Sequence, residues 1–358
     1  MDPLTKLRNE LDSIDDELLA QLNRRARTVE RVAALKAKSD APFYAPNRER
    51  EIVERLTKAN DGPFPNTAIA PVMQEVISAC LSLEQRQRVA YLGPEGTFTH
   101  MAVLQQFGRS ARPVPCGTIA AVFEEVERGE ANFGVVPIEN SSEGMVAHTL
   151  DTFVDSDLHI IAEVRVLVTH CLLVRYGGNE STIERVYSHP QALAQCSAWL
   201  KTNLPAAALI ESASTADAAR ACHSDPRAAA IASAQASRMH DLELLRSQIQ
   251  DHADNVTRFL VLAKEARTSA PTDSDTTTVL MVLRHDPGAL YAALKPLSEA
   301  SVNVTKIESR PSRREAWDYV FFLDLDGHAD SEPLASALAA VKCQCQHLRV
   351  LGTYRKRA

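Results

Sequence analysis

Residues 4–36, LTKLRNELDSIDDELLAQLNRRARTVERVAALK, decide the fold of the N-terminal part of the chain. Steps of three and four place apolar residues on one face, so this stretch predicts a long amphipathic helix. Arg8, Arg25 and Lys36 interrupt that face, where a buried, unpaired charge is unfavourable. Arg25 and Lys36 differ by about 20° around the helix and by about 16 Å along it. Their side chains can converge on one small anionic ligand, or alternatively extend to solvent.

Two shorter helices follow this stretch. The first opens at residues 47–51, NRERE, and ends at the loop 60–65, NDGPFP; the second runs from Ile69 to Glu84 and carries Cys80 one turn before its end. We expect lengths of about 35, 14 and 18 residues for the three helices. The first is too long for the other two to cover, so we expect a second protomer to complete the core in a homodimer.

These three predicted helices resemble the all-helical chorismate mutases. The resemblance implies chorismate as the substrate and Lys36 and Glu84 as catalytic residues, with Lys36 at the ether oxygen. It places substrate contacts at Arg8, Arg25, Lys36, Arg48, Glu49, Cys80 and Glu84. Two departures stand out: Ala45 occupies a position that is commonly acidic in the family, and some relatives use Ser and Gln where this chain has Cys80 and Glu84.

Composition excludes several function classes. The 358 residues carry a net charge of -7, which argues against nucleic acid or an anionic membrane as the main partner. No apolar run reaches the ~18 residues of a membrane span, and the first residues do not resemble a signal peptide. The seven scattered cysteines indicate a reducing, cytoplasmic location. Because CxxC, HExxH, P-loop and GxGxxG motifs are absent, we expect no cofactor and no bound metal.

Two polar joints divide the sequence, at residues 84–88 and at residues 265–275. They predict three domains, at residues 1–86, 88–265 and 276–354. Between the joints, short apolar runs alternate with helical patterns, which indicates an α/β domain with a mostly parallel sheet. Several of these runs end in polar clusters, where strand ends and helix N-termini supply donors for an anion, although each cluster alone also suits a capped helix.

Four separated motifs in this middle region, GPEGTFTH, PIENSSEG, YSHPQ and NVTRF, resemble prephenate dehydratase. The resemblance implies two α/β lobes of the periplasmic-binding type, prephenate as the substrate bound in the cleft, and no cofactor. It makes Thr257 essential, and leaves open whether Thr257, Glu139 or His189 manages the proton. It places substrate contacts at Thr97, Glu139, Asn140, Ser141, Ser188, His189, Gln191, Asn255, Arg258 and Phe259.

The C-terminal region predicts a βαββαβ order, which is a ferredoxin-like α+β fold. The expected elements are 277–283, 288–300, 302–309, 317–323, 331–342 and 346–353. Its first turn and its ESRP stretch resemble ACT domains, which implies phenylalanine as an allosteric inhibitor bound at Gly288, Ala289, Leu290, Glu308, Ser309 and Arg310. The alternative is structural, since Gly288 suits a tight turn and Arg310 an exposed strand end.

Together the three resemblances imply a multidomain enzyme of phenylalanine biosynthesis. It would rearrange chorismate to prephenate, then decarboxylate and dehydrate prephenate to phenylpyruvate. A non-enzymatic amino-acid sensor is the first alternative, but it gives no reason for the cations at positions 8, 25, 36 and 48. A mutase fused to a dehydrogenase is the second, and the missing GxGxxG motif argues against it.

Overall fold

The computed structural model describes residues 2–36, 46–84, 86–266, 270–311 and 319–356; Ala45 and Trp317 lie outside these ranges. The chain forms two compact units. One contains residues 1–87 and 104–112, and the other contains residues 88–103 and 113–358. None of the described helices is both long and apolar enough to cross a membrane.

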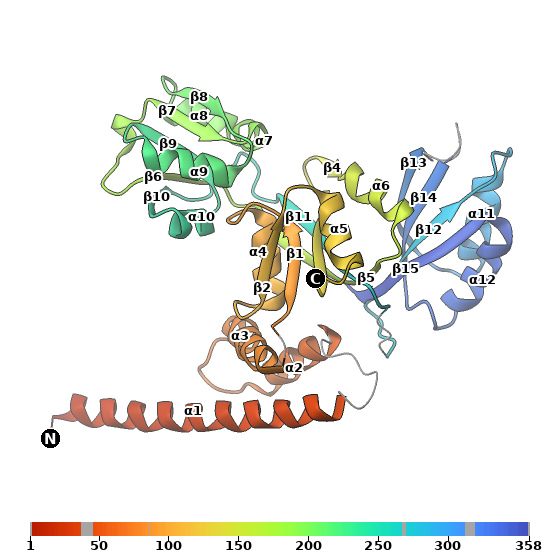
Figure 1. The fold of residues 1–358 in the computed structure, drawn as a ribbon, viewed down its shortest axis with the longest axis horizontal. Coiled ribbons are helices and arrows are strands. Elements are labelled where there is room, and N and C mark those ends of the chain that lie inside the picture. Colours follow the sequence, from red (N-terminus) through yellow and green to blue (C-terminus); the bar gives the residue numbers. More distant parts are fainter. Residues whose placement is uncertain (1, 37–45, 85, 267–269, 312–318, 357–358) are drawn as a thin grey trace. The chain divides into compact units, whose positions relative to one another are not determined.

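The smaller unit is built on three helices, α1 (Pro3–Lys36), α2 (Pro46–Ala59) and α3 (Asn66–Glu84), and α1 and α2 both pack on α3 (Figure 1). The three predicted helices are therefore confirmed. No residue of α1 is buried. Its apolar face is exposed along nearly its whole length, at Leu4, Leu7, Leu11, Ile14, Leu18, Leu19, Leu22 and Leu35.

The larger unit begins with a lobe whose sheet has the order β2-β1-β3-β11-β5, with β4 paired to β3. Its strands are β1 (Arg88–Leu92), β2 (Arg112–Cys116), β3 (Phe133–Asn140), β4 (Gly144–Met145), β5 (His159–Leu167) and β11 (Val256–Ala263). Its helices are α4 (Phe98–Phe107), α5 (Ile119–Glu127) and α6 (Ala147–Asp155). Strands β1 and β3 are parallel, but β11 is antiparallel to both β3 and β5. The sheet is mixed rather than mostly parallel, because β11 re-enters this lobe from the second one.

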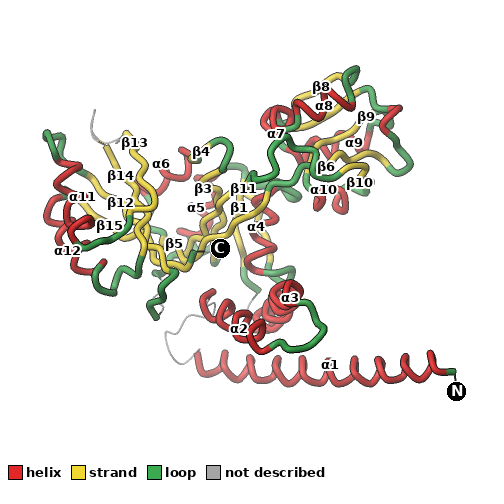
Figure 2. Tube along the Cα trace, turned by 180° about the vertical axis from the view of Figure 1, so that it is seen from behind, coloured by secondary structure: helices red, strands yellow, loops and turns green. Residues whose placement is uncertain are grey.

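The second lobe contains a five-stranded sheet of order β10-β6-β9-β7-β8 (Figure 2). Its strands are β6 (Cys171–Arg175), β7 (Arg185–Ser188), β8 (Ala208–Glu211), β9 (Ala228–Ala232) and β10 (Leu242–Arg246). Its helices are η1 (Glu180–Thr182), α7 (Pro190–Gln195), α8 (Ser197–Asn203), α9 (Thr215–Ser224) and α10 (Ala234–Met239). The chain passes twice between the lobes, and the two crossing segments are joined by a hydrogen bond from the Val168 N–H to the Asn255 carbonyl, 2.7 Å long.

The C-terminal part of this unit has the predicted βαββαβ order. Its elements are β12 (Asp275–Val282), α11 (Ala289–Glu299), β13 (Val304–Pro311), β14 (Tyr319–Asp326), α12 (Leu334–Gln344) and β15 (His347–Arg355). The sheet has the order β13-β14-β12-β15 and is antiparallel throughout. Helices α11 and α12 cover one face of it (Figure 1).

The other face of the β12–β15 sheet packs on the first lobe. One apolar cluster draws from both, including Ile138, Phe153 and Leu260 of the lobe and Leu280, Val320, Phe322, Leu351 and Tyr354 of the C-terminal sheet. At Gly352 the backbones approach so closely that a Cβ atom would lie 2.0 Å from the Ile160 carbonyl oxygen. The second and third predicted domains thus share one apolar core, and the boundary between them stays a prediction.

Candidate active site

The smaller unit brings together the two residues predicted to catalyse the rearrangement. Lys36 ends α1 and Glu84 ends α3. Burial raises the pKa of the Glu84 carboxyl, and the nearby Lys36 ammonium opposes this shift without cancelling it. The pKa of Glu84 is therefore above its ordinary value, which favours the protonated form.

Two buried polar atoms without hydrogen-bond partners also belong to the predicted mutase residues. Arg25 Nη1 and Glu84 Oε2 are buried polar atoms that have no hydrogen-bond partner. Such atoms are uncommon in folded proteins and call for an explanation. Both belong to residues predicted to contact an anionic substrate. Cys80, one turn before Glu84, is 6 % exposed.

Arg8 and Arg48 lie on exposed parts of their helices. Arg8 is exposed and precedes Arg25 by about 25 Å along α1. Arg48 is exposed and forms a 2.8 Å ion pair with Glu51. Glu49 is half-buried in the first turn of α2.

In the larger unit, Thr257 is the second residue of β11. The strand register places Thr257 opposite Asn140 and Arg258 opposite Glu139. Because successive residues of a strand point to opposite faces of its sheet, Thr257 shares one face with Asn140. Arg258 shares the other face with Glu139.

The Asn140 amide contacts the Thr257 side chain. Asn140 Nδ2 donates to Thr257 Oγ1 at 2.9 Å and to Asn255 Oδ1 at 2.8 Å. Ser141 Oγ accepts the Val256 N–H at 2.9 Å, which holds the start of β11 beside the end of β3. Since Thr257 Oγ1 accepts a hydrogen bond from Asn140, its own O–H is available to donate to another group.

The remaining dehydratase residues mostly shape backbone turns. Thr97 Oγ1 donates to the Pro94 carbonyl at 2.9 Å, ahead of α4. His189 caps α7, where its Nδ1 accepts the Gln191 N–H at 3.3 Å. The Ser188 hydroxyl is buried and donates to the Ile231 carbonyl at 2.7 Å. Phe259 is also buried. Their proposed contacts with substrate stay predictions.

Arg258 faces the C-terminal sheet. Its guanidinium lies 2.7 Å from Glu163 and from Asp324 and 3.4 Å from Glu139, and it donates to the Tyr354 hydroxyl at 3.1 Å. Burial opposes its charge, but Tyr354, Asp324 and Glu163 together raise the pKa of Arg258. The arginine therefore remains cationic within a buried network that spans both sheets.

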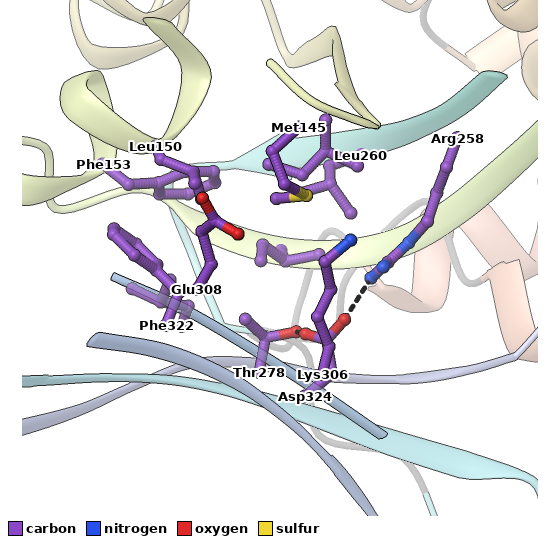
Figure 3. A pocket seen from close by; sticks show the side chains of 13 residues that line it. Met145, Leu150, Phe153, Arg258, Leu260, Thr278, Lys306, Glu308, Phe322 and Asp324 are labelled. Atoms are coloured by element: carbon purple, nitrogen blue, oxygen red, sulfur yellow. Dashed lines mark hydrogen bonds and ion pairs between the residues drawn. The ribbon is translucent and has the colours of Figure 1, made fainter. Parts of the chain in front are cut away.

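A small cavity lies beside this network. Figure 3 shows the side chains of Arg258 and Lys306 converging near Asp324, with the Glu308 carboxylate near Leu150. The Lys306 ammonium lies 2.5 Å from Glu139. Charged groups of β3 and β11 thus meet charged groups of β13 and β14.

The predicted phenylalanine contacts fall into two groups. Gly288, with φ +81°, begins α11, and the surrounding loop lines a surface hollow with Tyr319 and Phe321. Arg310 reaches the same end of the sheet, but its guanidinium donates to Asp151 of α6 at 3.0 and 3.2 Å. Ala289 and Leu290 line the same hollow, whereas Glu308 lines the cavity beneath the sheet and Ser309 lines neither.

Two residues close to Thr257 escaped the sequence analysis. Gln195 Oε1 accepts a hydrogen bond from Asn255 Nδ2 at 3.0 Å, and His170 Nε2 lies 2.8 Å from the same oxygen. Gln195 follows the YSHPQ motif by one helical turn, which was an available signal. His170 lies between two apolar runs and offered none.

Comparison with family models matches all three regions. Residues 7–85 match chorismate mutase type II, residues 89–267 match prephenate dehydratase, and residues 277–343 match the ACT domain. The three helices of the smaller unit, the two-lobed α/β fold and the βαββαβ sheet agree with these three matches.

Individual relatives extend the comparison. A bifunctional chorismate mutase/prephenate dehydratase of Aquifex aeolicus is 48% identical over 360 residues, covering 99% of each chain. A prephenate dehydratase of Arthrobacter aurescens, solved with L-Phe, is 37% identical with a TM-score of 0.71, covering 75% of this chain and 90% of that one. The quorum quenching acylase GqqA is 30% identical with a TM-score of 0.71, covering 76% and 98%. This chain belongs to the bifunctional chorismate mutase/prephenate dehydratase family.

Proposed function

We propose that this chain rearranges chorismate to prephenate in its helical part and then converts prephenate to phenylpyruvate in the two-lobed part, with phenylalanine as a feedback inhibitor. The proposal rests on the bifunctional relative of Aquifex aeolicus, which is 48% identical to this chain over 99% of both sequences. The approach of Lys36 to Glu84, and of Asn140 to Thr257, supports it residue by residue. Loss of carboxylate and hydroxyl creates an aromatic ring, so aromatisation supplies the driving force and the site need only bind and donate.

The direct test follows chorismate supplied to the full-length protein, with and without phenylalanine. We expect prephenate to form and then phenylpyruvate, with phenylalanine slowing the second step. An amino-acid sensor without activity would bind phenylalanine and leave chorismate unchanged. Prephenate supplied alone separates the two reactions.

An acylase activity like that named for GqqA is less well supported. Hydrolysis through a threonine nucleophile needs a base that removes the hydroxyl proton. The described partner of Thr257 Oγ1 is the Asn140 amide nitrogen, which donates and cannot accept that proton. The same geometry suits a hydroxyl that donates to a leaving group.

A homodimer accounts for the exposed face of α1. Its eight exposed leucine and isoleucine side chains form an apolar stripe that the described helices of the smaller unit leave uncovered. Arg8 is too distant to join Arg25 in one chain, so it would complete the partner's site. A cytoplasmic location fits the seven cysteines, all of which are unpaired.

The pKa of Glu84 leads to a prediction about pH. Only the protonated carboxyl can donate to the ether oxygen of chorismate, so the mutase rate should fall as pH rises through the raised pKa of Glu84. Glu84→Gln supplies a permanent N–H donor and should flatten this profile, giving higher activity than the parent at pH 8. Initial rates between pH 5 and 9 measure it.

The matched control is Glu75→Gln, which changes an exposed carboxylate of the same helix that lies near Arg109. It should keep the parent profile. If Glu84→Gln also keeps that profile, Glu84 is only the last turn of its helix.

Regulation leads to a prediction about Asp324. Phenylalanine bound at the Gly288 loop must favour one arrangement of the chain over another to act at a distance. We propose that the Arg258 network carries this effect, because it joins the C-terminal sheet to the residue next to Thr257. Asp324→Asn should weaken phenylalanine inhibition at least about fivefold, with basal dehydratase activity within about twofold of the parent.

Asp326→Asn is the matched control, since Asp326 lies two residues along the same strand and pairs with Lys356 and Asn303 instead. Dose–response curves for phenylalanine compare the variants. Equal sensitivity of Asp324→Asn and the parent would remove Arg258 from the route. Point variants suit this question better than deletion of residues 272–358, which would expose the shared apolar core.

A further inference from the structure

A continuous row of hydrogen bonds links Thr257 to the second lobe. Asn140 bonds to Thr257 and to Asn255, Asn255 bonds to Gln195, and Gln195 bonds to His170. Every distance in the row lies between 2.8 and 3.0 Å. The family motifs include the first three residues but neither Gln195 nor His170.

One backbone donor sets the direction of the whole row. The Ser142 N–H can only donate, and it lies 2.9 Å from Asn140 Oδ1. The opposite atom of that amide, Nδ2, must therefore be the donor to Thr257 and to Asn255 Oδ1. Asn255 Nδ2 must then donate to Gln195 Oε1.

The same reasoning assigns the tautomer of His170. Gln195 Oε1 already accepts from Asn255 and can only accept from His170, so His170 carries its proton on Nε2. Gln195 Nε2 points instead to the Glu143 carboxylate, at 3.4 Å, which agrees with this orientation. A neutral imidazole protonated on Nε2 leaves Nδ1 as an acceptor, and Nδ1 is buried without a partner.

The surroundings of His170 keep it in this state. The side chain is 2 % exposed, and burial lowers its pKa, although the bond to Gln195 partly opposes the shift. Its backbone N–H donates to Gln250 Oε1 at 3.0 Å, and its ring forms a T-shaped pair with Phe98, with 5.7 Å between centroids. The imidazole is therefore held in one place as a fixed donor.

We propose that His170 is a positioning residue for the dehydration of prephenate, acting through Gln195. By fixing Gln195 it holds the Asn255 and Asn140 amides so that Asn140 donates to Thr257 Oγ1, which leaves the threonine O–H directed at the departing hydroxyl. The inference rests on the proposed dehydratase function. Because Gln195 and His170 belong to the second lobe and Thr257 to the first, this alignment also depends on how the lobes meet.

The test uses the full-length protein with prephenate as substrate and no phenylalanine. His170→Phe keeps an aromatic ring but removes the donor, and Gln195→Met keeps the length but removes the acceptor. Each should lower kcat at least about tenfold while KM changes less than about twofold. His170→Gln retains an N–H donor and should recover most of the lost kcat. A merely structural role would not separate kcat from KM or distinguish Phe from Gln at position 170.

Three controls make the result decisive. His240→Phe alters another histidine of the same lobe that lies outside the row, and it should leave kcat unchanged. Circular dichroism and thermal unfolding of every variant report on the folded state of the larger unit, which holds both residues. Nitrogen NMR of the labelled imidazoles should show His170 protonated on Nε2 alone at pH 7 in the resting protein.

Two results would overturn the inference. One is a parent that dehydrates prephenate while His170→Phe and Gln195→Met keep its kcat. The other is a His170 protonated on Nδ1 or on both nitrogens. A parent that does not act on prephenate at all would instead contradict the proposed function, so the two failures are distinguishable.

Discussion

Thr257→Val is expected to abolish conversion of prephenate to phenylpyruvate, lowering kcat at least about a thousandfold. Valine keeps the β-branched shape that suits a buried strand position but has no O–H. The hydroxyl accepts from Asn140, so its proton is available for the leaving hydroxyl of prephenate. Without this donor the hydroxyl must leave as a poorly stabilised anion.

Phenylpyruvate formation from supplied prephenate measures the effect. Thr257→Ser is the matched variant, because it keeps a hydroxyl on the same side-chain carbon, Cβ, and it should retain far more activity than valine. Chorismate-to-prephenate conversion and phenylalanine binding should survive both changes. If the valine variant retains more than about a tenth of the parent rate, the essential donor lies elsewhere, with Glu139 and His189 as the next candidates.

Lys36→Met should reduce the mutase rate by a factor equivalent to about 3–4 kcal/mol of transition-state stabilisation, the range for one preorganised donor. The rearrangement develops negative charge on the ether oxygen as its bond breaks, and Lys36 is the cation proposed to meet it. Methionine preserves the apolar stem of lysine on α1. Dehydration of supplied prephenate should remain near the parent rate.

Lys58→Met changes a lysine in the last turn of α2 and serves as the control. Its mutase rate should match that of the parent. A parallel loss of both activities in Lys36→Met would contradict two separate sites, because the cluster of Lys36 and Glu84 contains no dehydratase residue.

Mixing variants tests whether the mutase site is shared between protomers. Arg8→Ala and Lys36→Met should each be nearly inactive alone. After unfolding and refolding together, about half of the dimers pair one of each, and each such dimer regains one intact site of two. Activity should recover to about a quarter of the parent value. No recovery would place Arg8 and Lys36 in the same protomer's site, or outside it.

Local patterns predicted most of the architecture. The 3.6-residue period of residues 4–36 predicted α1, and the order of strands and helices predicted the βαββαβ sheet. The two lobes were implied by the resemblance to prephenate dehydratase, whereas alternation alone predicted a mostly parallel sheet. The separated motifs predicted that Asn140 and Thr257 belong to one site. The helix caps at Thr97, whose Oγ1 accepts the His100 N–H, and at His189 followed from the same polar clusters.

What the sequence by itself determined was the type and order of the elements and the identity of the motif residues, because these depend on side-chain periodicity and on short-range turns. Tertiary structure alone decided which groups those residues meet. Arg258 pairs with Asp324, 66 positions away, and Asn140 reaches Thr257 across 117 positions. Alternation along β11 predicts that Thr257 and Arg258 face opposite sides. The packing of the C-terminal sheet on the first lobe decided that Arg258 faces Asp324. The crossing of the chain between the lobes decided that Thr257 joins the row of hydrogen bonds that ends at His170.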